Sequence, residues 1–348
     1  MKKTRNGTID FLKFLFSVII VLFHPHIMID DAKFFDGGYI FVEFFFIVSG
    51  YYMMLSYSKK EHNISIASDT FEYLRNKMIN LMPNLIISAF IGYVVWHRNE
   101  LSLFNFASNF SRDIFWKVLF LQQTGLGKDY DVTWYLSAML ISMLLVYPCI
   151  RLFKENFYLI AVILILFLMG YMYKTCGHFD FVWGYRVFYY NGMYRGLNGI
   201  LTGCICFAIS EKLSKIKFTK FMYVLFTAIE CAIYTFVLVF VYKRGHSLWD
   251  FFIFVLLTIA IIISTSQVSY SKNVFNHKIF MWLGEYSYSL FLGHIFWRDY
   301  FSPLSIGYRL CMYVLTSLVT GLIIMYLTKF LRYLWKKNKA LIKKIVIE

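Results

Sequence analysis

Long apolar segments recur from one end of the chain to the other, and the short segments between them hold most of the charged residues. Each apolar segment has about 17–22 residues, which is enough to cross a bilayer as an α-helix. The pattern therefore predicts an all-α membrane protein with about ten transmembrane helices. The predicted spans are 9–27, 39–57, 78–96, 133–152, 157–173, 194–209, 221–241, 248–264, 279–297 and 309–331.

The segments between the spans contain no linker rich in Pro, Gly or Ser, no low-complexity tract and no clear internal repeat. We therefore predict a single transmembrane domain over residues 1–331. The stretch 116–122 is too short to span, and we expect it to lie at the membrane interface or to re-enter the membrane. Residues 332–348 form a basic tail, which we predict to contact anionic lipid on the cytoplasmic face.

Composition agrees with a membrane protein, because only 16% of the residues are charged, against about 25% in soluble domains. If the N-terminus is cytoplasmic, most of the 35 Lys and Arg residues fall on the cytoplasmic side. This bias predicts that both termini are cytoplasmic. It also accounts for the net charge of +15 without a nucleic-acid partner. Frequent Lys, Asn, Ile and Tyr indicate a bacterial source, so we expect a multi-pass protein of the plasma membrane.

The first apolar segment and the six cysteines each have a simple interpretation. The first apolar segment contains charged residues and no small-residue cleavage site, so we expect a mature helix and not a cleaved signal peptide. The six cysteines are scattered and indicate neither a disulfide framework nor a zinc site. Cys204 and Cys206 are expected to fill the core.

The first span, "IDFLKFLFSVIIVLFH", carries its polar residues on one face. Successive helical residues turn by about 100°, so Asp10, Lys13, Ser17 and His24 lie within about 60° of one another. Polar groups at membrane depth face protein or a water-filled cavity, and the stripe therefore predicts an active-site wall. Two simpler interpretations remain open. Lys13 could extend to the headgroups, and His24 could be an interfacial histidine.

Other spans contribute candidate polar residues. Glu43 in the second span is costly in a membrane unless it is paired, so it either orients His24 or forms a salt bridge to Lys13 or Arg195. Arg195 and Asn198 share a face of the sixth span, where they could bind an acceptor. His294 in the ninth span is either a second site histidine or a packed histidine with a satisfied hydrogen bond.

Several motifs, taken in order, resemble those of the acyltransferase 3 family of membrane acyltransferases over about residues 5–298. The first is a basic residue, ten further residues and a histidine, here Lys13 and His24. The second span resembles the family pattern of a Gly-rich entry, an acidic residue, a Phe run and a Ser-Gly-aromatic ending. The matching sequences are "IDFLKFLFSVIIVLFH", "GGYIFVEFFFIVSGYYM", "YLRNKMINLMP", "DVTWYLSAMLISMLLVYP", "YRGLNGILTG" and "LGEYSYSLFLGH". Two positions depart from the family pattern, since Asn80 stands where many members have Arg and Met139 where many have Glu.

The resemblance implies an integral membrane O-acyltransferase. Such an enzyme moves an acyl group, most often acetyl, from cytoplasmic acyl-CoA to a hydroxyl of a cell-surface or exported glycan. The implied partners are membrane lipid, acyl-CoA and the glycan acceptor, with no nucleic acid, no metal and no permanently bound cofactor. The oligomeric state, the acyl group and the acceptor are left open.

Particular residues are candidates for each role in this reaction. His24 is the candidate base or acyl carrier, because its side chain titrates near physiological pH, and Glu43 is its candidate partner. Fixed cations on the cytoplasmic side suit the phosphates of CoA. The donor-binding candidates are Lys13, Arg75 and Lys77, although Arg75 and Lys77 also fit ordinary positive-inside charge. The chamber and acceptor candidates are Asp10, Ser17, Ser49, Gly50, Tyr51, Trp134, Arg195, Asn198, Ser287 and His294.

Two other classes of function compete with the enzyme. A transporter or flippase of a lipid-linked glycan precursor also fits many spans with intramembrane charges. It predicts paired broken helices, for which four prolines offer few candidates. A non-catalytic scaffold gives no reason to keep Lys, His and Glu at membrane depth. Loss of function in His24→Ala with normal membrane insertion separates the enzyme from the carrier.

Overall fold

The computed structural model describes residues 5–27, 35–98, 103–126, 131–186, 189–298, 300–301 and 305–347. These residues are mostly helical, with one short antiparallel pair of strands, β1 (Tyr185–Arg186) and β2 (Tyr189–Tyr190). The α-helices are α1 (Gly7–Phe23), α2 (Phe41–Tyr57), α3 (Ile66–Trp96), α4 (Leu103–Val118), α5 (Trp134–Phe153), α6 (Phe157–Thr175), α7 (Gly192–Ser214), α8 (Lys220–Lys243), α9 (Trp249–Ser266), α10 (Ser271–Phe275), α11 (Lys278–Gly293) and α12 (Ile306–Ile347).

Six segments of the described chain are long and apolar enough to cross a membrane, so the prediction of an all-α membrane protein is confirmed. They are Gly38–Tyr57, Ile66–Trp96, Trp134–Thr175, Lys220–Lys243, Trp249–Ser266 and Ile306–Asn338. The third of them contains both α5 and α6. Each of the ten predicted ranges falls on a helix, but three of these helices are not among the six segments. α1 and α11 have only 17 and 16 residues, and α7 has 23 residues but is not apolar enough. Ten spans and cytoplasmic termini therefore stay predictions.

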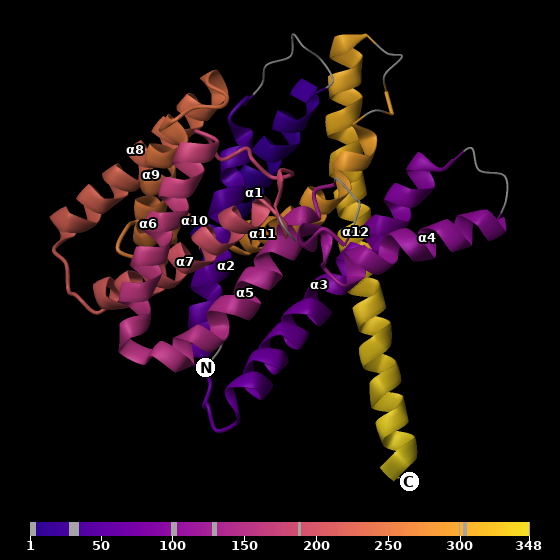
Figure 1. Cartoon of the computed structure of the whole chain (residues 1–348), viewed down its shortest axis with the longest axis horizontal. Coiled ribbons are helices and arrows are strands. Elements are labelled where there is room, and N and C mark those ends of the chain that lie inside the picture. The colour runs from indigo at the N-terminus through magenta and orange to yellow at the C-terminus, as the bar shows by residue number, and fades with distance from the viewer. Residues whose placement is uncertain are drawn as a thin grey trace.

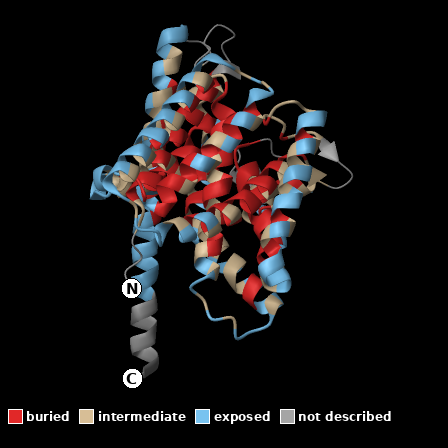
Figure 2. Ribbon diagram, turned by 90° about the vertical axis from the view of Figure 1, so that its left-hand side faces the viewer, coloured by how far each residue is buried: buried red, intermediate tan, exposed pale blue. Residues whose placement is uncertain are grey.

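The helices surround a central buried core. Figure 1 shows α1, α2 and α11 in the middle, with α6, α8 and α9 to one side and α3, α4 and α12 to the other. The closest helix pairs are α2 with α7 and α1 with α11, and α11 also packs on α12. In Figure 2 the buried residues gather at the centre, while the C-terminal part of α12 extends beyond the bundle.

Glycines bring α2 and α7 unusually close together. A Cβ atom added to Gly50 would lie 2.2 Å from the Ile200 carbonyl oxygen, and one added to Gly203 would lie 2.1 Å from the Ile47 carbonyl oxygen. Small residues at such contacts let helix backbones approach each other in a membrane. The same pair of helices carries Glu43 and Arg195, so this contact positions an ion pair described below.

Two helices extend past the predicted spans. α3 begins at Ile66, where Ser65 caps the helix by accepting a hydrogen bond from the Ser68 N–H at 3.2 Å. α12 continues through the predicted boundary at residue 331 as far as Ile347. A hydrophobicity pattern marks only the apolar part of a helix, whereas helical hydrogen bonds continue into polar sequence. The stretch 116–122 is not a span, because α4 ends at Val118 and a 3₁₀ turn follows at Gln122–Thr124.

Candidate active site

Two histidines from helices at opposite ends of the sequence meet beside a cavity of the protein. His24 follows the last residue of α1 and His294 follows the last residue of α11. Their rings lie 4.8 Å apart between centroids, and Nε2 of His294 lies 3.3 Å from Nδ1 of His24. The packing of α1 on α11 is what joins them, so the structure brings a predicted base and a predicted chamber residue together.

The hydrogen bonds of the two rings define which nitrogen carries the proton. Nδ1 of His24 lies 2.8 Å from the Ile20 carbonyl oxygen, and Nδ1 of His294 lies 2.7 Å from the Phe291 carbonyl oxygen. A carbonyl oxygen only accepts, so Nδ1 of each neutral ring carries the hydrogen. Nε2 of His294 is then an acceptor facing the Nδ1–H of His24. In this tautomer Nε2 of His24 is the nitrogen without a hydrogen, as a general base requires.

Glu43 forms a fully buried ion pair with Arg195. The Arg195 Nε donates to Glu43 Oε1 at 2.6 Å, and both side chains are at most 2% exposed. A second Arg195 nitrogen donates to the Tyr39 carbonyl oxygen at 3.0 Å, and the guanidinium carbon lies 5.0 Å from the centroid of the Trp134 ring. Of the partners foreseen for Glu43, the structure gives it Arg195. A catalytic role for Glu43 stays a prediction.

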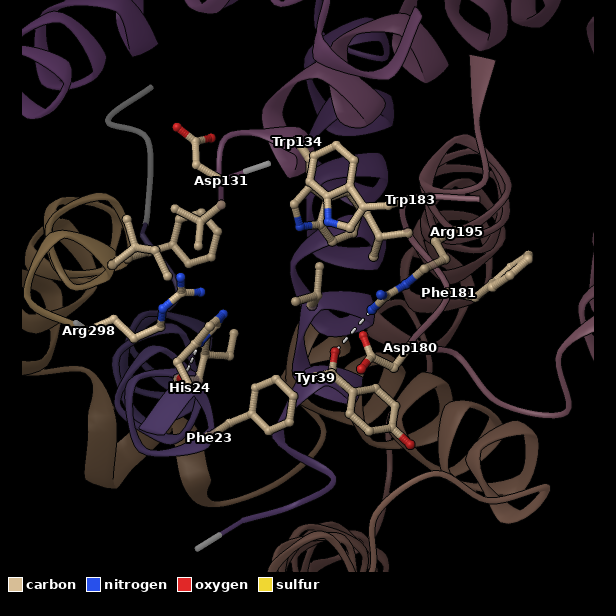
Figure 3. Close-up of a pocket in the computed structure, with 16 residues that line it drawn as sticks. Phe23, His24, Tyr39, Asp131, Trp134, Asp180, Phe181, Trp183, Arg195 and Arg298 are labelled. Atoms are coloured by element: carbon tan, nitrogen blue, oxygen red, sulfur yellow. Dashed lines mark hydrogen bonds between the residues drawn. The ribbon is translucent and has the colours of Figure 1, made fainter. Parts of the chain in front are cut away.

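A cavity of about 440 Å³, which we call the histidine cavity, opens beside His24. Figure 3 shows His24 and Arg298 on one side of it, Arg195, Asp180 and Tyr39 on the other, and Trp134 and Trp183 between them. Charged groups beside flat aromatic faces suit a ligand rich in hydroxyl groups. The lining residues are Ile20, Phe23, His24, Tyr39, Val42, Asp131, Val132, Trp134, Asp180, Phe181, Val182, Trp183, Arg195, Phe291, Ile295 and Arg298.

A second cavity of about 280 Å³, the lysine cavity, lies along the same helices. Lys13 and Lys77 are its charged lining residues, and Ser49, Tyr135 and Ser287 add hydroxyl groups. Lys77 has no acidic partner among the residues that the structure describes. Two ammonium groups and one compensating carboxylate make this end of the cavity attractive to an anion. The rest of the lining is Val42, Phe45, Val48, Tyr52, Leu81, Leu136, Met139, Gly284, Tyr288 and Phe291.

The polar stripe of α1 continues into this second cavity. Asp10 is 4% exposed and accepts from Arg5 at 2.8 Å and from Lys13 at 3.3 Å. Asp10 fits against α11 because position 284 is glycine, where a Cβ atom would lie 2.5 Å from the Asp10 side chain. Lys13 also lies 5.0 Å from the centroid of the Tyr52 ring. Lys13 therefore faces the cavity inside the protein, as the stripe predicted, and its side chain is 24% exposed.

Other predicted site residues lie outside the lining of both cavities. Arg75 is exposed, whereas Lys77, two residues further along α3, reaches the lysine cavity. Gly50 faces α7, and Tyr51 packs against Phe207 with ring centroids 5.6 Å apart. Gly50 and Tyr51 line neither cavity, so their positions do not support the predicted role in the reaction chamber.

Two buried polar residues also lie away from the cavities. The amide nitrogen of Asn198 donates to the Met169 sulfur at 3.5 Å, and Ser17 is buried on α1. Of the remaining candidates, Ser49 Oγ lies 3.2 Å from the Tyr135 hydroxyl, and Ser287 Oγ donates to the Gly284 carbonyl at 2.9 Å.

Sequence reasoning missed several residues of the histidine cavity. Asp131 pairs with Lys117 at 2.8 Å, and Asp180 pairs with His246 at 2.9 Å. Trp183 and Arg298 complete the set. All four cavity residues lie outside the apolar helices, where no periodicity marks the face of a side chain. The one available signal was the density of Asp, Trp and aromatic residues in "HFDFVWGYR", which follows the fifth predicted span.

Contacts around Asp180 shift the pKa values of three side chains near this loop. Burial alone would raise the pKa of Asp180, but the His246 hydrogen bond and the Arg195 charge outweigh it, so this pKa lies below 3.8. The hydrogen bond to Asp180 in turn raises the pKa of His246 above 6.5, against the effect of burial. The His178 ring stacks on His246 with centroids 4.3 Å apart, and burial lowers the pKa of His178.

Within the described ranges, no group of three or more His, Cys, Asp or Glu side chains is arranged to hold a metal ion. Apolar helices, two cavities and a histidine pair with one buried member, His294, together define a multi-pass membrane protein with an internal site. A family model described as an acyltransferase domain matches residues 6–329. The chain therefore belongs to the acyltransferase 3 family, as its motifs predicted, and this membership supports membrane acyltransferase activity. No curated protein and no solved structure matches the chain significantly.

Proposed function

We propose that this protein is an O-acyltransferase that moves an acyl group, most often acetyl, from cytoplasmic acyl-CoA to a hydroxyl of a cell-envelope glycan. The proposal places it in a bacterial plasma membrane with Lys13 toward the cytoplasm. The observation that carries it is the pair of cavities along α1. One has two lysines at its lining, the other has His24, and Val42 and Phe291 line both.

The donor fits the lysine cavity. CoA is polyanionic at its nucleotide end, and fixed cations bind phosphate groups through charge-assisted hydrogen bonds. Lys13 and Lys77 supply these cations, while the apolar walls and the hydroxyl groups of Ser49 and Tyr135 suit an extended thioester arm. Lys13 and His24 are eleven positions apart on one helix face, which is about 16 Å along the axis. A thioester arm that lies along this face would extend from the lysines, which bind the phosphates, to His24.

The acceptor fits the histidine cavity. In the direct route, a glycan hydroxyl gives its proton to Nε2 of His24 while its oxygen attacks the thioester carbon. The carbon–sulfur bond breaks, and the leaving CoA sulfur takes the proton from the imidazolium. In the alternative route, Nε2 attacks the thioester first and CoA leaves as the thiolate. The glycan hydroxyl then attacks the acyl-imidazolium, its proton passes to the thiolate, and neutral His24 is released. Both routes use the same nitrogen.

The test is label transfer from radiolabelled acetyl-CoA to extracted cell-envelope glycan by the purified protein in detergent. His24→Ala should abolish transfer with an unchanged gel-filtration profile. His97→Ala is a matched control, because Nδ1 of His97 makes the same bond to the carbonyl four residues earlier, at 3.1 Å, and His97 lines neither cavity.

If wild-type protein leaves both acetyl-CoA and succinyl-CoA untouched, with and without glycan, the acyltransferase proposal fails. Transport of a lipid-linked glycan precursor is then the function to examine. Equal transfer by wild type and His24→Ala would instead support the acyltransferase activity and contradict the catalytic role of His24.

A further inference from the structure

The two cavities are divided by a small apolar partition, which consists of Val42 on α2 and Phe291 on α11. Both residues line both cavities, and each is only 8% exposed. The Phe291 ring is held among other rings, with centroids 5.8 Å from Tyr135 and 6.5 Å from Phe45. A group that passes from one cavity to the other where they adjoin therefore moves past these two side chains.

The partition stands at one end of the lysine cavity, and the cations stand at the other. Along α2 the cavity follows one helix face through Val42, Phe45, Ser49 and Tyr52. Val42 and Tyr52 are ten residues apart, which is about 15 Å along the helix. Lys13 lies over the Tyr52 ring, at the far end from Val42. The part of the cavity next to the partition is therefore apolar and aromatic.

The backbone at the partition is fixed, so its side chains set the size of the opening. The Phe291 carbonyl oxygen accepts the hydrogen bond from Nδ1 of His294, which in turn faces His24. A shift of this backbone would move the carbonyl group that holds His294, whereas the Phe291 ring touches one member of the histidine pair, His294, with ring centroids 5.9 Å apart. Only a group small enough to be admitted by ring rotation passes the partition without moving that carbonyl group.

We infer that Val42 and Phe291 are the residues that select the acyl group: they admit a small uncharged acyl group and exclude longer or charged ones. This inference rests on the proposed function. A longer chain would need more room than one rotated ring provides. A succinyl carboxylate would have to lose its water beside Phe45, Tyr135 and Phe291, where no cation lines the wall, and an unpaired charge is costly there.

The experiment compares acetyl-, propionyl-, butyryl- and succinyl-CoA as donors for the full-length protein in detergent, with extracted cell-envelope glycan and release of free CoA thiol as the readout. Wild type should use acetyl-CoA best, because one methylene in a close-fitting apolar pocket changes kcat/KM by about 10–200-fold. Phe291→Ala should raise the butyryl-to-acetyl ratio of kcat/KM by about tenfold or more. Val42→Phe should lower turnover of every donor.

Phe207→Ala is the matched control, since Phe207 is 6% exposed, belongs to the same core and lines neither cavity. Its donor preference should equal that of wild type. If Phe291→Ala does not fold, Phe291→Leu and Val42→Ala test the same opening with smaller changes.

The possible failures are distinguishable. If wild type releases CoA from no donor, the proposed function is wrong and the inference is lost with it. If wild type uses acetyl-CoA but the partition variants keep its donor ratios, only the inference is overturned. A wild type that prefers succinyl- or butyryl-CoA also overturns it.

Discussion

Nε2 of His294 lies 3.3 Å from Nδ1 of His24, although 270 residues separate them in the chain. The two rings meet because α1 packs on α11, and each ring is oriented by a carbonyl group of its own helix. His294 therefore contacts the His24 ring at Nδ1 and not at Nε2, which is the nitrogen that would take the proton.

His294→Ala should lower kcat for acetyl transfer about 10- to 100-fold, because a hydrogen bond that strengthens as His24 becomes charged is lost. KM for acetyl-CoA should change little, because His294 lines neither cavity. His294→Asn keeps an acceptor oxygen and should recover part of kcat. Steady-state kinetics of the three proteins check this, and equal loss in the Ala and Asn variants would reduce His294 to a packing role.

Lys77 and Arg75 form a natural pair for testing the donor site. Lys77→Gln should raise KM for acetyl-CoA about tenfold with little change in kcat, because one charge-assisted hydrogen bond to the donor is lost. Arg75→Gln should leave KM unchanged, since this side chain is exposed and lines neither cavity. A similar rise in KM for both variants would indicate a general electrostatic effect of the surface.

The buried pair of Glu43 and Arg195 should be sensitive to the loss of either partner. Arg195→Gln or Glu43→Gln should each destabilise the protein by about 3–5 kcal/mol, because an uncompensated charge is left inside. The double variant Glu43→Gln/Arg195→Gln should recover part of this loss. Thermal unfolding in detergent measures it, with Lys215→Gln as a control from the exposed Lys215–Glu211 pair. Additive losses in the double variant would contradict the coupling.

The α2–α7 contact should not tolerate a single added methyl group. Gly50→Ala should destabilise the protein by about 1–3 kcal/mol, because its Cβ atom would meet the Ile200 backbone. Gly170→Ala in α6 meets no atom within 4 Å and should be neutral or stabilising by up to about 1 kcal/mol, as alanine favours a helix. Unfolding temperatures of the two variants in one detergent give the comparison. Equal temperatures would argue against close packing at Gly50.

The ion pair of His246 and Asp180 predicts a pH-dependent stability. The raised pKa of His246 means that its contribution is fully present below pH 6.5 and is lost as the pH rises through the folded-state value. The lowered pKa of Asp180 means that its contribution is present above pH 3.8 and is lost as the pH falls through its folded-state value. The pair should therefore stabilise the protein most between those two limits.

His246→Gln should accordingly lower the unfolding temperature at pH 5.5 and have a smaller effect at pH 8.5. In an Asp180→Asn background the pH dependence of this effect should be smaller, because Asp180 makes the largest contribution to the raised pKa of His246, while Asp250 and Asp36 also raise it. A difference between wild type and His246→Gln that is constant across this pH range would contradict the assignment.

The sequence was informative where helix geometry alone decides the outcome. The spacing of Asp10, Lys13 and His24 placed them on one face, and that face does line the inside of the protein. The sequence left three possible partners for Glu43, which were His24, Lys13 and Arg195. The packing of α2 on α7 places Arg195 next to Glu43, and no local pattern predicts that packing. The meeting of His24 with His294 required knowing that α1 packs on α11, which no local pattern encodes.

Other parts of the site could not be predicted for physical reasons. Asp180 and Trp183 lie in a loop, and a loop has no period from which a side-chain direction follows. Lys77 and Arg75 differ by two positions on one helix, so a half turn separates the residue that lines the lysine cavity from the exposed one. Gly50 matched a family motif, but its position is explained by helix packing.

Both histidines sit at the C-terminal ends of helices, and the carbonyls that hold them belong to the last turns of α1 and α11. A helix C-terminus carries roughly half a negative charge, which stabilises a nearby cation. Two such ends converge on one pair of rings. An imidazolium formed during acyl transfer would thus be stabilised by peptide dipoles, in the place where many enzymes use a carboxylate. The position of both rings at helix ends therefore lets backbone dipoles act on the charge that the reaction would create.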